Sequence, residues 1–144
     1  MSDVTTALDK LLADSYTLYV KTHGYHWNVK GPMFNSLHVM FEDQYSELAL
    51  AVDEIAERSR ALEAPALGSY AQFGAITDVP EDTTVPKAMD MVANLVKDHE
   101  TVVAAAKALV AAAEEAGDDA SVDLGVRRID THEKTAWMLR SHLE

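Results

Sequence analysis

The sequence predicts an all-α protein, a bundle of four long helices with one long central connection that contains a short helix. Apolar residues recur at helical spacing in four segments, and no segment shows the sustained alternation of apolar and polar residues typical of a strand. Three of the four prolines fall between positions 65 and 86, which places the long connection there. With 144 residues, the chain is long enough for a single domain, 1–144, with a substantial core.

The first two predicted helices are separated by a tight break. The first ends near Asn28, because the Gly-Pro pair at 31–32 breaks a helix. The second covers about 34–62, and Pro65 and Gly68 close it. The apolar stripes of the two helices are Leu8, Leu11, Leu12, Ser15, Leu18, Tyr19 and Thr22, and then Leu37, Phe41, Leu48, Val52, Ile55 and Ala56.

The long connection leads into the third predicted helix. A short helical turn is expected at 69–74, where two aromatic residues stand close together. The third helix is predicted to begin at about Val85 or Pro86, since proline suits the first helical turn, and Gly117 supplies its C-terminal cap. Its stripe is Met89, Val92, Leu95, Val96, Val102, Val103 and Leu109.

The fourth predicted helix begins near Asp119 or Ser121. Its apolar stripe is Val126, Ile129, Ala136, Leu139 and Leu143. Four helices joined by two short connections and one long central one match the ferritin-like four-helix bundle.

The composition narrows the possible functions. The 24 acidic and 12 basic residues give a formal net charge of −12, which disfavours nucleic acid and anionic membranes as partners. Cysteine is absent, which excludes disulfides, thiolate metal sites and thiol nucleophiles. The N-terminus resembles neither a signal peptide nor a transit peptide, and no apolar run reaches about 18 residues. A cytoplasmic protein that does not span a membrane is therefore expected.

Four polar residues of the second helix are candidate metal ligands. His38, Glu42, Asp53 and Glu57 lie within an arc of about 100° around the helix axis. A solvated acidic face is the simpler interpretation. However, His38 with Glu42 and Asp53 with Glu57 both have i, i+4 spacing, which points the two side chains of each pair toward the same place. Two carboxylates as close together as Asp53 and Glu57 repel each other unless a cation lies between them. Carboxylate oxygen with imidazole nitrogen is a ligand set that suits iron or manganese.

The distance along the helix indicates how such a site could be completed. Glu42 and Asp53 are eleven residues apart, about 16 Å at 1.5 Å per residue, whereas the metals of a dinuclear site lie about 3.5 to 4 Å apart. Two copies of the helix packed antiparallel across a twofold axis would bring the two pairs together at two equivalent sites. A site within one ferritin bundle would need Glu-x-x-His, and no histidine here has a glutamate three residues before it.

Several motifs together resemble a known family. They are HWNVKGPMF at 26–34, His38, FEDQY at 41–45, VDEIAER at 52–58 and THEKTAWMLR at 131–140. With these segments the chain resembles the Dps family of mini-ferritins, and the resemblance extends over all four helices.

The resemblance implies a ferroxidase that protects cells from oxidative stress. It implies a hollow homododecamer that oxidises Fe(II), preferably with hydrogen peroxide rather than oxygen, and stores ferric mineral inside. Each site would hold two irons between subunits, with His26, His38 and Glu42 from one subunit and Asp53 and Glu57 from the other. The family often has Asp at the position of Glu42, so the longer side chain is expected to shift the second metal position or its affinity.

Two aromatic residues near this motif allow alternative interpretations. Trp27 is either an interface or core aromatic residue or an electron donor and radical trap near the site. His23 stands three residues before His26 and could share a metal with it.

Acidic residues at the start of the last helix are candidate pore residues. In the resembling family, acids near this junction help to admit Fe(II), which suggests Asp119 and Asp123. The alternative is that they stabilise a helix N-terminus, the interpretation favoured for Asp118.

Two other functions are alternatives to iron oxidation. A nucleoid-associated protein that compacts DNA is disfavoured, because the net charge is negative and neither end carries a basic tail. A metal-free structural assembly would explain the helices but not the two ligand pairs on one face.

Overall fold

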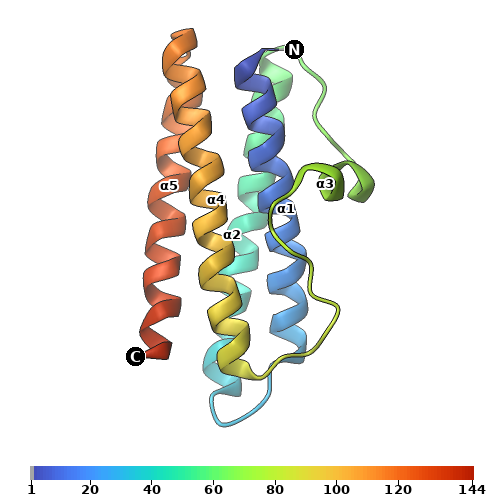
Figure 1. Cartoon of the computed structure of the whole chain (residues 1–144), viewed down its shortest axis with the longest axis vertical. Coiled ribbons are helices and arrows are strands. Elements are labelled where there is room, and N and C mark those ends of the chain that lie inside the picture. Colours follow the sequence, from blue (N-terminus) through green and yellow to red (C-terminus); the bar gives the residue numbers. More distant parts are fainter. Residues whose placement is uncertain (1) are drawn as a thin grey trace.

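The computed structural model describes residues 2–144, and in that range the protein is helical and contains no strand. Figure 1 shows four long helices side by side and a long connection that runs down the outside of the bundle. The helices are α1 (Asp3–Asn28), α2 (Phe34–Ala61), α3 (Tyr70–Ile76), α4 (Ala88–Ala116) and α5 (Asp119–Arg140), followed by a 3₁₀ turn, Ser141–Leu143. The predicted all-α, ferritin-like fold with a short helix in its central connection is confirmed.

The order of the helices explains the long connection. Short loops make α1 antiparallel to α2 and α4 antiparallel to α5, whereas the connection returns the chain to the other end, so that α2 and α4 run parallel (Figure 1). The pairs α1–α2, α1–α4 and α4–α5 pack extensively, and α2 meets α5 more sparsely. No helix between residues 2 and 144 is long and apolar enough to cross a membrane.

Helix ends follow local sequence signals in most places. The Ser2 hydroxyl accepts a hydrogen bond from the Thr5 N–H at the start of α1, and the Asp118 carboxylate does the same for the Ser121 N–H in α5. Gly117 ends α4 in the left-handed region with φ of 69°, as predicted for a glycine cap.

The predicted start of α4 at Val85 or Pro86 is wrong. The helix begins at Ala88, with Lys87 as its N-cap in an extended conformation (φ −63°, ψ 154°). Pro86 therefore lies before the helix rather than in its first turn. Proline disfavours helical backbone in the residue before it, which keeps Val85 in the connection as well.

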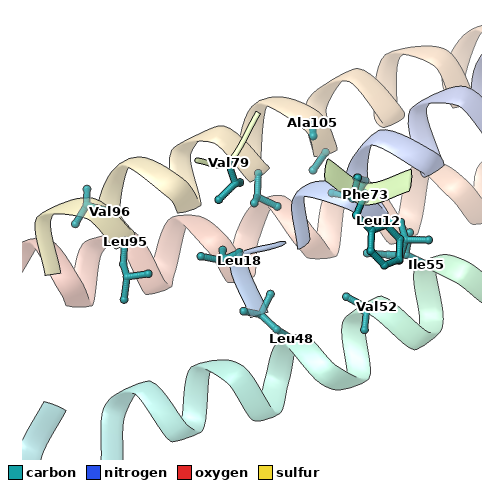
Figure 2. Packing of buried hydrophobic residues seen from close by; sticks show 14 of the residues in the cluster. Leu12, Leu18, Leu48, Val52, Ile55, Phe73, Val79, Leu95, Val96 and Ala105 are labelled. Atoms are coloured by element: carbon teal, nitrogen blue, oxygen red, sulfur yellow. The ribbon is translucent and has the colours of Figure 1, made fainter. Parts of the chain in front are cut away.

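The core lies between the helices, as the apolar stripes predict. Apolar side chains of α1, α2 and α4 pack together with Phe73 of α3 and Val79 of the connection (Figure 2). Most predicted core residues of these three helices are buried, and Tyr19, Ala56 and Met89 are half-buried.

The predicted core face of α5 is partly wrong. Val126 is 50% exposed and Leu143 is 44% exposed. The buried face carries polar residues as well as apolar ones: Leu124, Arg128, His132, Ala136 and Leu139. An apolar pattern does not reveal this face, because a buried arginine, paired with the half-buried Glu47, and a buried histidine take the place of two apolar residues.

Polar residues of α1 attach the long connection to the bundle. The buried Asp14 carboxylate accepts hydrogen bonds from the Thr77 hydroxyl at 2.7 Å and the Asp78 N–H at 2.8 Å. The Lys21 ammonium donates to the Pro80 carbonyl at 2.8 Å and pairs with Asp98 of α4 at 2.8 Å. These contacts fix the position of α3 against α1.

Candidate metal centre

Three of the five predicted ligands meet where α1 turns into α2. His26 lies in the last turn of α1, and His38 and Glu42 lie one turn apart near the start of α2. Gly31 has a φ of +107°, a backbone conformation that residues other than glycine rarely adopt, and it allows the chain to reverse direction between the helices. The ligand atoms of the three side chains all lie within 4.8 Å of one another.

Reciprocal hydrogen bonds fix the two imidazole rings. His26 Nδ1 lies 2.7 Å from the His38 carbonyl oxygen, and His38 Nδ1 lies 2.7 Å from the His26 carbonyl oxygen. A carbonyl oxygen only accepts, so each Nδ1 carries the proton and donates it. In the neutral rings, each Nε2 therefore keeps its lone pair for a metal, and the backbone bonds orient the ligands. The rings also stack, with centroids 3.8 Å apart.

The surroundings of the cluster suit a metal with open coordination positions. His26 is buried, His38 is half-buried, and the Glu42 side chain is 55% exposed. His26 Nε2 and Glu42 Oε1 are 3.9 Å apart, beyond a hydrogen bond. Two histidines and one carboxylate with open positions form a set used for Fe(II) in oxidising enzymes.

The other two predicted ligands lie elsewhere on the chain. Asp53 and Glu57 are exposed on α2, and Asp53 is about 16 Å along the helix from Glu42. Asp53 lines a cavity of about 600 Å³ between α2, α1 and the connection, together with Tyr16, Tyr70 and Phe73. A single copy of the chain therefore does not bring all five residues to one place.

Aromatic rings surround the histidine cluster. Tyr45 lies 5.1 Å from His26 in a T-shaped arrangement, centroid to centroid, and 4.2 Å from the stacked ring of His23. Tyr45 is not among the residues predicted from the sequence. Its position seven residues after His38, two turns further on α2, was the signal that could have found it.

His23 lies between aromatic rings and outside the group of metal ligands. Its imidazole centroid is 3.9 Å from the Trp27 ring and 6.2 Å from the His26 ring. Burial, followed by the neighbouring His26, lowers the pKa of His23. Trp27 is 63% exposed, so it is not a core residue. The interface and electron-donor interpretations of Trp27 stay predictions.

The acidic residues near the start of α5 have local partners. Asp118 is the N-cap and also accepts a hydrogen bond from the Arg58 guanidinium at 2.9 Å, in agreement with the helix-end interpretation. Asp123 pairs with Arg127 at 2.9 Å, and Asp119 is exposed in the first turn of α5. The pore interpretation of Asp119 and Asp123 stays a prediction.

Two other histidines form a buried pair between α4 and α5. His99 Nδ1 and His132 Nδ1 are 2.8 Å apart, and Arg128 donates to His132 Nε2 at 2.8 Å. Burial is the main cause that lowers the pKa of His99 to about 3 and that of His132 well below its ordinary value. Both are hydrogen-bonded core residues.

Comparisons with known proteins extend over the whole bundle. Residues 5–144 match the Ferritin family, described as a ferritin-like domain. The chain is 36% identical to DNA protection during starvation protein 2 of Bacillus anthracis over 140 residues, which cover 97% of this chain and 96% of that protein.

Solved structures agree with this match. The crystal structure of Dps from Staphylococcus aureus is similar with a TM-score of 0.95 and 34% identity, covering 98% of this chain and 95% of that one. Dps from Vibrio cholerae O1 is described as a member of a broad superfamily of ferritin-like diiron-carboxylate proteins. Its structure is similar with a TM-score of 0.94 and 32% identity, covering 98% of this chain and 89% of that one. The likeness includes both helices that hold the histidine cluster.

Proposed function

The chain belongs to the Dps family of ferritin-like proteins, and on that premise we propose that it oxidises Fe(II) and stores the ferric product inside a hollow shell of twelve copies. The observation that carries this proposal is the cluster of His26, His38 and Glu42, whose two free Nε2 lone pairs and one carboxylate suit Fe(II). The diiron-carboxylate description of the Vibrio cholerae protein supports iron as the metal.

A second copy of the chain completes the site in this proposal. Across a twofold axis, antiparallel α2 helices bring Asp53 and Glu57 of one copy to the histidine cluster of the other. Val39 and Leu50 lie beside the ligand residues on α2 at 49% and 75% exposure. Exposed apolar side chains next to an incomplete site are the feature expected of a surface that a second copy covers.

Each ligand has a role that follows from its chemistry. Asp53 and Glu57 hold the first Fe(II), with one or both histidines completing its coordination. Glu42 helps to hold the second iron. Carboxylate oxygens stabilise Fe(III) relative to Fe(II), which favours the loss of electrons to the oxidant.

Two irons at one site can reduce peroxide completely. One hydrogen peroxide takes one electron from each of two Fe(II) ions and two protons from solvent, giving two waters and two Fe(III) ions. No hydroxyl radical is released in this reaction, which accounts for a protective function. We propose peroxide as the preferred oxidant, with oxygen as the alternative.

The charge of the chain favours iron over DNA as a direct partner. Although the Bacillus anthracis relative is named for DNA protection, a net charge of −12 per copy opposes contact with phosphates. A gel-shift assay at low salt without bridging metal tests this, and retardation of plasmid would count against the proposal.

Stopped-flow Fe(II) oxidation with peroxide and with oxygen tests the activity, on protein whose mass has been measured in solution. Asp53→Ala should abolish the rapid peroxide-dependent phase. Asp43→Ala is the matched control, because Asp43 is an exposed acid of α2 with no hydrogen bond or ion pair in the part of the chain that the structure describes. An unchanged initial rate in Asp53→Ala would contradict the assignment.

A further inference from the structure

Three tyrosines form a continuous line of rings that starts at the histidine cluster. The ring centroid of Tyr45 lies 5.1 Å from that of His26, and the Tyr19 ring lies 6.1 Å from the Tyr45 ring. The Tyr16 ring stacks on the Tyr19 ring at 5.7 Å, with only 16° between the planes. We call Tyr45, Tyr19 and Tyr16 the tyrosine column.

The helices determine this arrangement. Tyr16 and Tyr19 are three residues apart on α1, a spacing that places side chains on one face of a helix. Tyr45 extends the line from α2, which packs against α1 in the antiparallel direction. All three rings are half-buried between the helices.

The far end of the tyrosine column lies at the Asp53 cavity. Tyr16 stacks on Phe73 at 4.7 Å and meets the edge of the Tyr70 ring at 6.3 Å. Tyr16, Phe73, Tyr70 and Asp53 line the same cavity of about 600 Å³. The column therefore joins the two regions of one chain that hold its two groups of proposed ligands.

Packing explains the rings but not their hydroxyl groups. Phenylalanine would fill the same space between α1 and α2, and within residues 2–144 no phenol of the column makes a hydrogen bond. By contrast, Tyr25, also on α1, donates to Asp82 and accepts from Asn94. A phenol differs from a phenyl ring in that it can give up one electron and one proton and later regain them.

We propose that the tyrosine column carries single electrons between two metal sites, an inference that rests on the proposed function. In the proposed dimer, the histidine cluster and Asp53 of one chain belong to different sites. The column of each chain then connects the two sites of the dimer. This electron transfer is needed when each site holds only one Fe(II), because one Fe(II) supplies only one of the two electrons that peroxide takes.

The electrons balance in this arrangement. Peroxide at one site takes its first electron from the iron there. Its second electron comes from Tyr45. Tyr19 then reduces the oxidised Tyr45, and Tyr16 reduces the oxidised Tyr19. Finally, Fe(II) at the other site reduces the oxidised Tyr16. Each phenol gives up a proton on oxidation and regains one on reduction. The net reaction turns one peroxide, two Fe(II) ions and two protons into two waters and two Fe(III) ions.

Without the column, a single Fe(II) ion reduces peroxide only halfway. The products are then one Fe(III) ion, one hydroxide ion and one hydroxyl radical. The tyrosine column therefore extends protection to protein that is only partly loaded with iron.

The test compares Tyr19→Phe with the parent protein at one Fe(II) per chain and at saturating Fe(II). Tyr19→Phe keeps the ring and removes the oxidisable hydroxyl in the middle of the column. At low loading, the parent protein should consume one peroxide for every two Fe(II) ions. The variant should move toward one peroxide per Fe(II) and release hydroxyl radical, measured by spin trapping. At saturating Fe(II) the two proteins should behave alike.

Tyr25→Phe is the matched control, because it removes a phenol from the same helix outside the column. This variant should keep the parent ratio of Fe(II) to peroxide at both loadings. A parent-like ratio in Tyr19→Phe at low loading would overturn the proposed path. Failure of the proposed function gives a different result, since the parent protein would then lack rapid oxidation even at saturating Fe(II).

Discussion

His26 Nε2 and Glu42 Oε1 lie 3.9 Å apart, too far for a hydrogen bond and close enough for one cation to contact both atoms. The two residues come from different helices, and the tight loop after α1 brings them together. His38, one turn before Glu42 on α2, adds a second imidazole lone pair on its Nε2 atom. The hydrogen bond from His38 Nδ1 to the His26 carbonyl oxygen holds this ring in place. The ligand atoms of these three side chains lie close enough together to form a candidate metal-binding group.

His38→Ala should weaken Fe(II) binding by at least about tenfold, because it removes one candidate ligand and the ring that stacks on His26. Anaerobic calorimetry with Fe(II) measures the affinity. His142→Ala is the control, since His142 is a histidine of the C-terminal turn that lies outside the cluster. Equal affinity in His38→Ala and the parent protein would exclude His38 as a ligand.

The contact between α4 and α5 depends on Gly125. A Cβ atom there would lie 2.7 Å from Val110 Cγ2 and 3.2 Å from the Ala106 carbonyl oxygen. We expect Gly125→Ala to lower the free energy of unfolding by about 1 kcal/mol, because overpacking exceeds the gain in helix propensity.

Gly24→Ala is the matched comparison for Gly125. Gly24 also lies within a helix, but a Cβ atom there meets nothing within 4 Å. This substitution should raise the free energy of unfolding by about 0.5–1 kcal/mol. Urea denaturation measures both variants, and stabilisation by both would show that α4 and α5 are not in close contact at Gly125.

The buried pair His99 and His132 should make the protein sensitive to acid. Their pKa values in the folded protein are lowered, to about 3 for His99, so the unfolded chain binds more protons between about pH 6.5 and pH 3. Stability therefore falls as the pH falls through that window, by up to about 1.4 kcal/mol per pH unit for each histidine. Urea titrations at several pH values measure this slope.

His99→Leu supplies the control for the acid effect. The variant removes one of the two buried titrating groups and should reduce the slope of stability against pH between about pH 4.5 and 6.5 by roughly half. His142→Ala, which removes a histidine from the exposed C-terminal turn, should leave the slope unchanged. An unaltered slope in His99→Leu would mean that other groups cause the acid sensitivity.

Asp118→Ala should lower the free energy of unfolding by about 1 kcal/mol, because it removes the side-chain cap of α5. Asp119→Ala should change it by less than about 0.5 kcal/mol, since Asp119 is exposed. Urea denaturation distinguishes the two. A loss of stability in Asp119→Ala as large as that in Asp118→Ala would contradict the assignment of the cap to Asp118.

The sequence was sufficient for the order of the helices and for the separation of the candidate ligands along α2. Helical periodicity depends only on local spacing, so the bundle and the separation of Glu42 from Asp53 could be predicted from residue numbers. The pairing of His26 with His38 came from the resemblance to a family. Their reciprocal hydrogen bonds depend on the path of the loop and became visible only in the structure.

The errors on α5 arose where buried polar groups replace apolar ones. Arg128 and His132 occupy the inner face of α5 because Glu47 and His99 supply hydrogen-bond partners from other helices. Such partners are distant in sequence, so a pattern of apolar residues cannot indicate them. Tyr45 differs, because its position two turns after His38 on α2 places it beside the histidines and could have been found in the sequence.

The central claim, that each site combines two copies of the chain, is tested by mixing two inactive variants. The double variant His26→Ala/His38→Ala lacks both imidazoles of the site and Asp53→Ala lacks one ligand of the carboxylate side, so homodimers of either should not oxidise Fe(II) rapidly. After dissociation and reassembly together, random pairing should restore about a quarter of the parent number of active sites, because each mixed dimer contains one intact site. Rapid peroxide-dependent oxidation at about that level in the mixture is the predicted result. A mixture no more active than the two variants alone, under conditions where mass spectrometry detects mixed assemblies, would contradict the account.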